Sequence, residues 1–189
     1  MNAADRDTRR AYVSVLAHWL HAAAPPPPAL LAPEMRARLA RLDAIVPGEH
    51  GLGCYPFSAR DTGIHVRLPA GRVAAMCAID ALAIARLSGE RMEIAAACVT
   101  CHTPIRCRVE SDGSLDHDQT GLARVVWLTA GAPATSCSEG VCRALHFLCP
   151  QCTAAAGSDV FTLPQAAAIG NAFFGFQRAL LRSETVVTA

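Results

Sequence analysis

Apolar residues recur at helical spacing near the start of the chain. Over residues 8–23 they return every three or four positions, and the four prolines at 25–28 must end this helix because proline has no amide donor. A second helix is predicted over 33–45, with a proline in its first turn. We therefore expect residues 1–48 to form a short N-terminal helical cap on a domain that spans residues 49–189.

The middle of the chain has the pattern of strands around one buried helix. Residues 53–58 and 63–68 are short, rich in aromatic and β-branched residues and separated by a turn-like segment, so they predict a hairpin. Residues 73–87 are almost wholly apolar and are followed by Ser88-Gly89, which predicts a buried central helix with a glycine stop. The other predicted elements are strands at 92–98, 103–109 and 123–130, a solvated loop at 111–121, an extended segment at 142–148, and a C-terminal helix over about 164–182. The pattern predicts an α+β fold, with a small antiparallel sheet around a buried central helix.

Composition narrows the classes of function. The chain has 189 residues, of which 52% are hydrophobic, enough to bury a core. Its 17 basic residues, all arginine, against 16 acidic ones give a formal charge of +1, so we expect no nucleic-acid partner. The N-terminus is charged, and no window approaches the roughly 20 apolar residues of a membrane span. We expect a cytoplasmic protein without a membrane partner.

Nine cysteines are many for a chain expected in a reducing compartment, at positions 54, 77, 98, 101, 107, 137, 142, 149 and 152. Disulfides are disfavoured there, so clustered cysteines point to metal binding or thiol chemistry.

Two of the reactive side chains lie together on the predicted central helix. Cys77 and Asp80 are three residues apart and would project from one helical face. Taken alone, Cys77 reads as a small core residue and Asp80 as a solvent-facing or capping acid. Together in an apolar helix, they indicate a thiol beside a proton carrier.

Three segments resemble the organomercurial (alkylmercury) lyase family in order and approximate spacing: GCYPFS at 53–58, MCAIDAL at 76–82 and CRALHFL at 142–148. The resemblance covers roughly residues 50–148, and Cys-Ala-Ile-Asp within an apolar helix is its most specific part. It implies an enzyme of mercury resistance and detoxification that cleaves a carbon–mercury bond by protonolysis, giving a hydrocarbon and Hg(II). The catalytic residues that it implies are Cys77, Asp80 and Cys142.

Chemistry agrees with what the resemblance implies. Mercury is a soft cation and thiolates are soft ligands, so Cys77 and Cys142 are the expected mercury ligands, while Asp80 relays a proton. Cys137 competes with Cys142 for the role of second thiol. The resemblance implies Cys142, because the count of residues back from His146 places Cys142 in the family's position. We expect no organic cofactor. Small thiols are the expected co-reactants, and a thiol-containing protein is the expected recipient of Hg(II).

A second set of cysteines consists of two CxxC pairs, Cys98 with Cys101 and Cys149 with Cys152. Two such pairs complete the tetrahedral four-thiolate set typical of structural zinc. The first pair falls at a turn between strands and the second before a segment that can begin a helix, which resembles a treble-clef zinc finger. We therefore predict a structural zinc ion and a treble-clef-like core. Of the remaining residues, Cys54 and Cys107 are expected to be buried bystanders, and His146 is expected to satisfy a core hydrogen bond.

Two alternatives to the lyase stay open. One is a non-enzymatic metal-binding or metal-delivery protein on a zinc-finger scaffold. The other is a related thiol-dependent lyase that acts on a substrate without mercury. The identity of the organic group and the oligomeric state are not encoded in any pattern of the chain.

Overall fold

The computed structural model describes residues 3–115, 121, 123–128, 136–153 and 159–185. Its helices are α1 (Ala3–Ala22), the 3-10 turn η1 (Pro28–Leu30), α2 (Pro33–Arg41), α3 (Ala78–Ser88), α4 (Val141–Ala144), α5 (Pro150–Thr153), α6 (Leu163–Phe173) and α7 (Gly175–Thr185). Its strands are β1 (Val46–Gly48), β2 (Gly51–Gly53), β3 (Phe57–Ser58), β4 (His65–Leu68), β5 (Gly71–Ala75), β6 (Met92–Ala97), β7 (Pro104–Val109), β8 (Arg124–Trp127), β9 (Leu145–Leu148) and β10 (Val160–Thr162).

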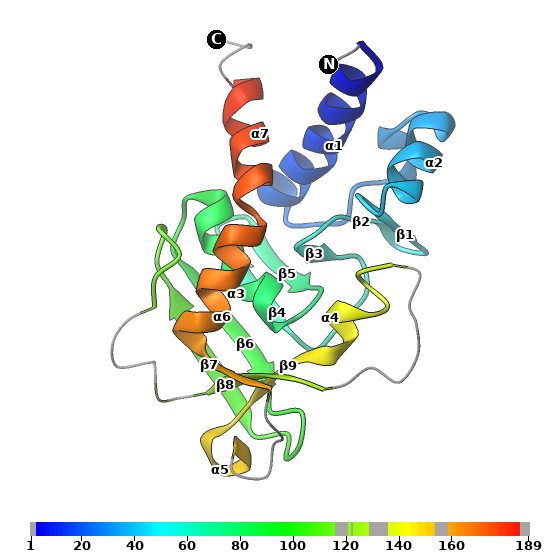
Figure 1. Ribbon diagram of the computed structural model, residues 1–189. Helices are drawn as coiled ribbons and strands as arrows, with labels where there is room; N and C mark the ends of the chain where they lie inside the picture. The colour runs from blue at the N-terminus through cyan, green and yellow to red at the C-terminus, as the bar shows by residue number, and fades with distance from the viewer. Residues whose placement is uncertain (1–2, 116–120, 122, 129–135, 154–158, 186–189) are drawn as a thin grey trace.

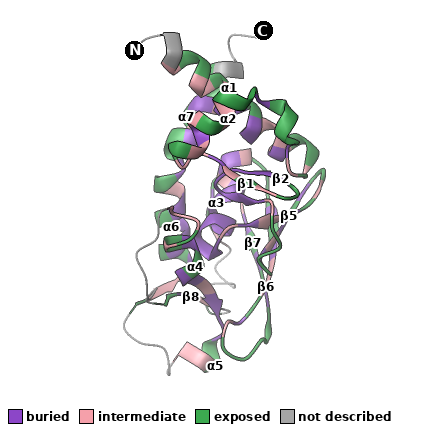
Figure 2. Ribbon diagram, turned by 90° about the vertical axis from the view of Figure 1, so that its right-hand side faces the viewer, coloured by how far each residue is buried: buried purple, intermediate pink, exposed green. Residues whose placement is uncertain are grey.

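Helix α3 lies at the centre of the molecule. It packs against β4, β5 and β6 on one side and against α6 and β9 on others, and Figure 2 shows it as a buried element between the sheet and the outer helices. Nearly every residue of α3 is buried, which agrees with its apolar sequence. The helix ends at Gly89, whose φ of 77° is left-handed and whose amide donates to the Ala85 carbonyl. The predicted α+β fold with a buried central helix is therefore confirmed.

The strands form antiparallel sheets of five, three and two strands. The five-stranded sheet has the order β3-β5-β4-β6-β7, the three-stranded sheet has the order β10-β8-β9, and β1 pairs with β2. The predicted hairpin between residues 53–58 and 63–68 is wrong. Strand β3 pairs with β5, and β4 pairs with β5 and β6, because the turn that reverses the chain lies at Leu68–Gly71.

Other element boundaries also differ from the predictions, and the helix predicted over 33–45 ends at Arg41. Residues 73–75 belong to β5, and the central helix begins only at Ala78, because an unbroken apolar run fits a buried strand as well as a helix. The segment 142–148 opens with one turn of helix, α4, before β9. The single C-terminal helix is divided at Phe174 into α6 and α7. Part of the predicted strand at 123–130 and of the loop at 111–121 falls outside the described residues.

The N-terminal helices pack onto the same core as the rest of the chain. The Trp19 indole donates a hydrogen bond to the Leu52 carbonyl at 2.9 Å and stacks on the Phe57 ring at a centroid distance of 5.3 Å. Helix α1 also packs against α7, and the start of α1 and the end of α7 lie at the same end of the molecule, at the top of Figure 1. No helix in the described part of the chain combines the length and apolarity needed to cross a membrane.

Candidate active site

Cys77 lies at the junction between β5 and α3, where it caps the N-terminus of the helix. Its backbone is extended (φ −153°, ψ 179°), and its Sγ accepts a hydrogen bond from the Asp80 amide at 3.4 Å. A serine or threonine usually fills this capping role, and here the thiol does. Cys77 and Asp80 are therefore brought together by this cap, and not by a shared helical face as the sequence predicted.

Cys142 reaches the same point from the other side of the molecule. It lies in α4, immediately before β9, and its thiol donates to Oδ2 of Asp80 at 3.6 Å. The ligand atoms of Cys77, Asp80 and Cys142 all lie within 4.8 Å of one another, and all three residues are buried. We call these three residues the thiol–carboxyl site.

Burial sets the protonation of the thiol–carboxyl site. Desolvation raises the pKa of Asp80 to about 7, although the thiols of Cys77 and Cys142 act in the opposite direction by hydrogen bonding. Burial also raises the pKa of Cys77. The pKa of Cys142 is raised as well, first by its hydrogen bonds to the thiols of Cys137 and Cys77 and then by burial. At neutral pH the site therefore holds protonated thiols beside a carboxyl group that both accepts and releases a proton readily.

Cys137 lies beside the thiol–carboxyl site but does not belong to it. Its thiol is half-buried and hydrogen-bonds to the Cys142 thiol, which lowers the pKa of Cys137. Among the described residues, the cluster around Asp80 contains Cys142 and not Cys137. The geometry thus gives the two competing cysteines different surroundings.

Two residues that the sequence analysis did not single out hold the loop before Cys142. The Cys137 amide donates to Oδ2 of Asp43 at 2.8 Å, and the Ser138 amide donates to the Tyr55 hydroxyl at 2.7 Å. The same hydroxyl donates to the Asp43 carboxylate at 3.1 Å. Tyr55 stands within the GCYPFS segment, so its place in that motif was the only available signal, and Asp43 had none.

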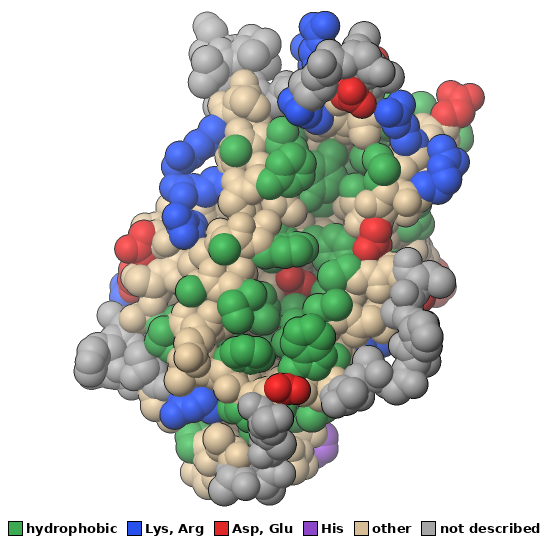
Figure 3. Space-filling model, viewed as in Figure 1, with side chains coloured by type: hydrophobic (Ala, Val, Ile, Leu, Met, Phe, Trp, Pro, Cys, Tyr) green, Lys and Arg blue, Asp and Glu red, His purple; other side chains and the backbone are tan. Residues whose placement is uncertain are grey.

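An apolar groove opens next to Cys137. It has a volume of about 340 Å³ and runs between α7 on one side and α1 and α2 on the other. Hydrophobic side chains gather along this face of the molecule (Figure 3). Its apolar wall is made by Tyr12, Leu39, Leu42, Ala44, Tyr55, Phe173, Phe176 and Leu180.

The two CxxC pairs form a second cluster. The four Sγ atoms of Cys98, Cys101, Cys149 and Cys152 all lie within 4.8 Å of one another, and those of Cys101 and Cys149 are 3.5 Å apart. Burial acts to raise the pKa of Cys98, but hydrogen bonds from backbone amides to its sulfur outweigh burial and lower the pKa to about 6. We call this the four-thiol cluster. The described residues contain no other cluster of three or more such ligands.

The remaining candidates lie outside both clusters. Cys54 and Cys107 are buried, and burial raises the pKa of each thiol to about 12, as expected for bystanders. The His146 ring is partly exposed and contacts the Arg143 carbonyl at 2.7 Å, so it lies at the surface and not in the core.

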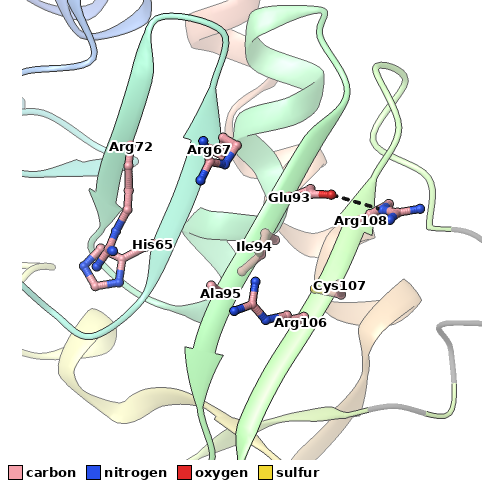
Figure 4. Close-up of a pocket in the computed structure, with 9 residues that line it drawn as sticks. All are labelled: His65, Arg67, Arg72, Glu93, Ile94, Ala95, Arg106, Cys107 and Arg108. Atoms are coloured by element: carbon pink, nitrogen blue, oxygen red, sulfur yellow. Dashed lines mark hydrogen bonds and ion pairs between the residues drawn. The ribbon is translucent and has the colours of Figure 1, made fainter.

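A larger pocket, of about 560 Å³, lies on the outer face of the five-stranded sheet (Figure 4). Side chains from β4, β5, β6 and β7 line it, and most of the charged ones are arginines. It includes none of the residues of either cluster.

Comparisons with known proteins cover the part of the chain that holds both clusters. The family model for alkylmercury lyase (MerB) matches residues 57–175, which include the thiol–carboxyl site and the four-thiol cluster. No curated protein sequence matches the chain significantly. Among solved structures, the crystal structure of the mercury-bound form of MerB2 is similar to this chain, with a TM-score of 0.59 and 21% identity over 78% of this chain and 74% of that one. The family model covers well over half of the chain, and the chain belongs to the alkylmercury lyase family.

Proposed function

We propose that this protein cleaves the carbon–mercury bond of small organomercury compounds by protonolysis, with Cys77 and Cys142 as mercury ligands and Asp80 as proton carrier. One observation carries the proposal above all: the Cys142 thiol donates to a buried carboxyl group that also neighbours the Cys77 thiol, and all three ligand atoms lie within 4.8 Å. Membership of the family and the mercury in the similar MerB2 structure support it.

Two thiolates at this spacing suit a soft, linear or trigonal metal ion. Sulfur is the softest ligand that a protein offers, and thiolates donate electron density that weakens the bond from mercury to carbon. The site also excludes water, since each of the three residues is at most 5% exposed. A dry site strengthens the interaction between the charged groups and the metal.

The proton balance assigns a separate task to each group. The substrate arrives as R–Hg–X, where X is a small thiolate. As the first Hg–S bond forms, X leaves with the proton of that thiol. As the second bond forms, the other thiol proton passes to the Asp80 carboxylate, and from there to the carbon as the C–Hg bond breaks. The products are R–H, XH and Hg(II) held by two cysteine thiolates, and a pKa of about 7 lets Asp80 both take up and release this proton.

The surroundings of Cys137 supply a route by which the substrate enters and the mercury product leaves. The apolar groove that borders this residue has room for a small organic group, and its aromatic wall favours hydrocarbon over water. Because Cys137 is half-exposed and adjacent to Cys142, small thiols or a thiol-containing protein can remove the Hg(II) product by ligand exchange from this side.

The test is to incubate the protein with a phenylmercury salt and excess small thiol and to measure benzene. We expect benzene from the wild type, none from Cys77→Ser or Cys142→Ser, and most of the activity from Cys137→Ser, because Cys137 is not in the cluster with Asp80. The variant Cys107→Ser, at a buried position outside both clusters, is the matched control. Mercury binding without benzene from the wild type would favour a metal-delivery protein instead.

If Cys137→Ser abolishes benzene release and Cys142→Ser does not, the second thiol is Cys137 and the assignment above is wrong. If the wild type neither binds the phenylmercury salt nor releases benzene, the substrate of the site is not an arylmercury compound.

A further inference from the structure

The four-thiol cluster takes no part in the proposed reaction, and its residues are contributed by two separated parts of the fold. Cys98 and Cys101 lie in the turn between β6 and β7, while Cys149 and Cys152 lie at the end of β9 and in α5, near the bottom of Figure 1. Cys98 and Cys149 are buried, whereas Cys101 is exposed. The cluster is thus built at the edge of the core, with one open side.

The local backbone is shaped around these sulfurs. The Cys98 amide donates to the Thr103 carbonyl at 2.9 Å, and the His102 amide donates to the Cys98 carbonyl at 2.9 Å, which closes a tight turn. His102 has a φ of 59°, a left-handed conformation that a residue other than glycine adopts at some cost. Within the same turn, the Cys101 sulfur lies 3.1 Å from the Thr103 hydroxyl oxygen. The turn is thus folded closely around the two sulfurs that it contributes to the cluster.

The distances agree with a single tetrahedral metal ion. A Zn–S bond of about 2.3 Å in tetrahedral geometry sets neighbouring sulfurs about 3.8 Å apart. The four Sγ atoms lie within 4.8 Å of one another, with 3.5 Å between Cys101 and Cys149. A four-thiolate set without an open position is a structural site and not a catalytic one.

We propose that the four-thiol cluster binds one Zn²⁺ ion, and that this ion clamps the C-terminal end of β9 to the β6–β7 turn. The clamp adds to a direct contact at the same place, where the Val99 amide donates to the Phe147 carbonyl at 3.0 Å. Metal binding by a site that forms only in the folded chain contributes directly to the stability of that chain.

The position of β9 links this clamp to the thiol–carboxyl site. Cys142 precedes the strand and Cys149 follows it, so the strand spans the distance between the two clusters. The β6–β7 turn belongs to the sheet whose strand β5 leads into Cys77. The ion therefore fixes the strand that carries one thiol to the sheet that carries the other. This positioning role depends on the proposed lyase site, whereas the metal site itself does not.

Metal analysis of untagged, purified protein is the first test. We expect about one zinc per chain, and near zero for Cys101→Ser and Cys149→Ser. Cys107→Ser should keep its zinc, since that thiol lies outside the cluster. Cobalt replacement of the zinc should give the visible absorption and the sulfur-to-metal charge-transfer band of tetrahedral four-thiolate cobalt. Neither measurement depends on turnover, so the zinc proposal can fail or succeed apart from the lyase proposal.

Amide hydrogen exchange tests the clamp. Cys101→Ser is the milder variant because Cys101 is exposed, and its thermal midpoint should fall by about 10 °C. Exchange in β9 and α4 should become faster by at least tenfold, while α3 and α6 stay protected. Three results would overturn the proposal. They are wild-type protein that contains no metal, a disulfide within the cluster of protein purified under reducing conditions, and unchanged exchange in β9 after zinc is lost.

Discussion

Replacing Asp80 by asparagine should remove a pH-dependent cost that the folded protein now carries. The side chain is 5% exposed, and burial raises its pKa to about 7 from an unfolded value of about 3.9. Between these two values the folded state holds a proton that the unfolded state has released. The free energy of unfolding must therefore fall as the pH rises through this window, and the loss is complete above pH 7.

The magnitude follows from the width of the window. An interval from about pH 4 to about pH 7, at about 1.4 kcal/mol per pH unit, amounts to about 4 kcal/mol. Asparagine has nearly the same shape as the protonated acid and carries no charge. We therefore expect Asp80→Asn to match the wild type near pH 4 and to be more stable by up to about 4 kcal/mol at pH 8.

Urea unfolding at pH values from 4 to 8, followed by the fluorescence of the buried Trp19, measures this difference. Because both proteins carry the same four-thiol cluster, its own pH dependence cancels. Asp61→Asn is a control of opposite sign, since hydrogen bonding to the Gly63 amide lowers the pKa of that exposed carboxyl in the folded state. Its difference from the wild type should be a loss of stability that is present at pH 8 and becomes smaller toward pH 4. A pH-independent difference between Asp80→Asn and the wild type would refute the reasoning about Asp80.

Two further substitutions test how the site is held. Gly170→Ala should destabilise the protein by about 1–3 kcal/mol, because the added Cβ would lie 2.8 Å from the Ile79 carbonyl oxygen where α6 meets α3. Gly175→Ala, whose added Cβ would meet nothing within 4 Å, is the control and should be neutral in urea unfolding. Tyr55→Phe should lower the free energy of unfolding by about 1–2 kcal/mol, because the Ser138 amide loses its acceptor and the loop before Cys142 loosens. It should also lower kcat more than it raises KM, and an unchanged kcat would remove the positioning role of Tyr55.

What could be predicted from the sequence was local or carried by a motif. The CxxC spacing alone predicted which cysteines would meet at the four-thiol cluster, because two residues between cysteines let both sulfurs face one point. The proximity of Cys77 and Asp80 was also predicted by their spacing, although the reason, a thiol cap in place of a shared helical face, was different. Their approach to Cys142 is a contact across 62 residues, and only the family resemblance suggested it.

What could not be predicted depends on long-range pairing. Residues 73–75 are apolar in either a strand or a helix, and only their pairing with β3 and β4 decides between the two. Long-range pairing also decides the place of β3, which pairs with β5 and not with β4, the next strand in sequence. Asp43 is one acid among 16, and its role is defined solely by the loop that folds back onto it.

The most direct test of the account is to measure benzene release and protein-bound mercury side by side for the wild type and Asp80→Asn, in a single turnover with a phenylmercury salt. Both proteins should bind mercury through Cys77 and Cys142. The wild type should release benzene, and Asp80→Asn should release it about 10² to 10⁴ times more slowly, the range typical of a lost proton carrier. Equal rates of release from the two proteins would contradict the role of Asp80, and mercury binding with no benzene from the wild type would contradict the lyase itself.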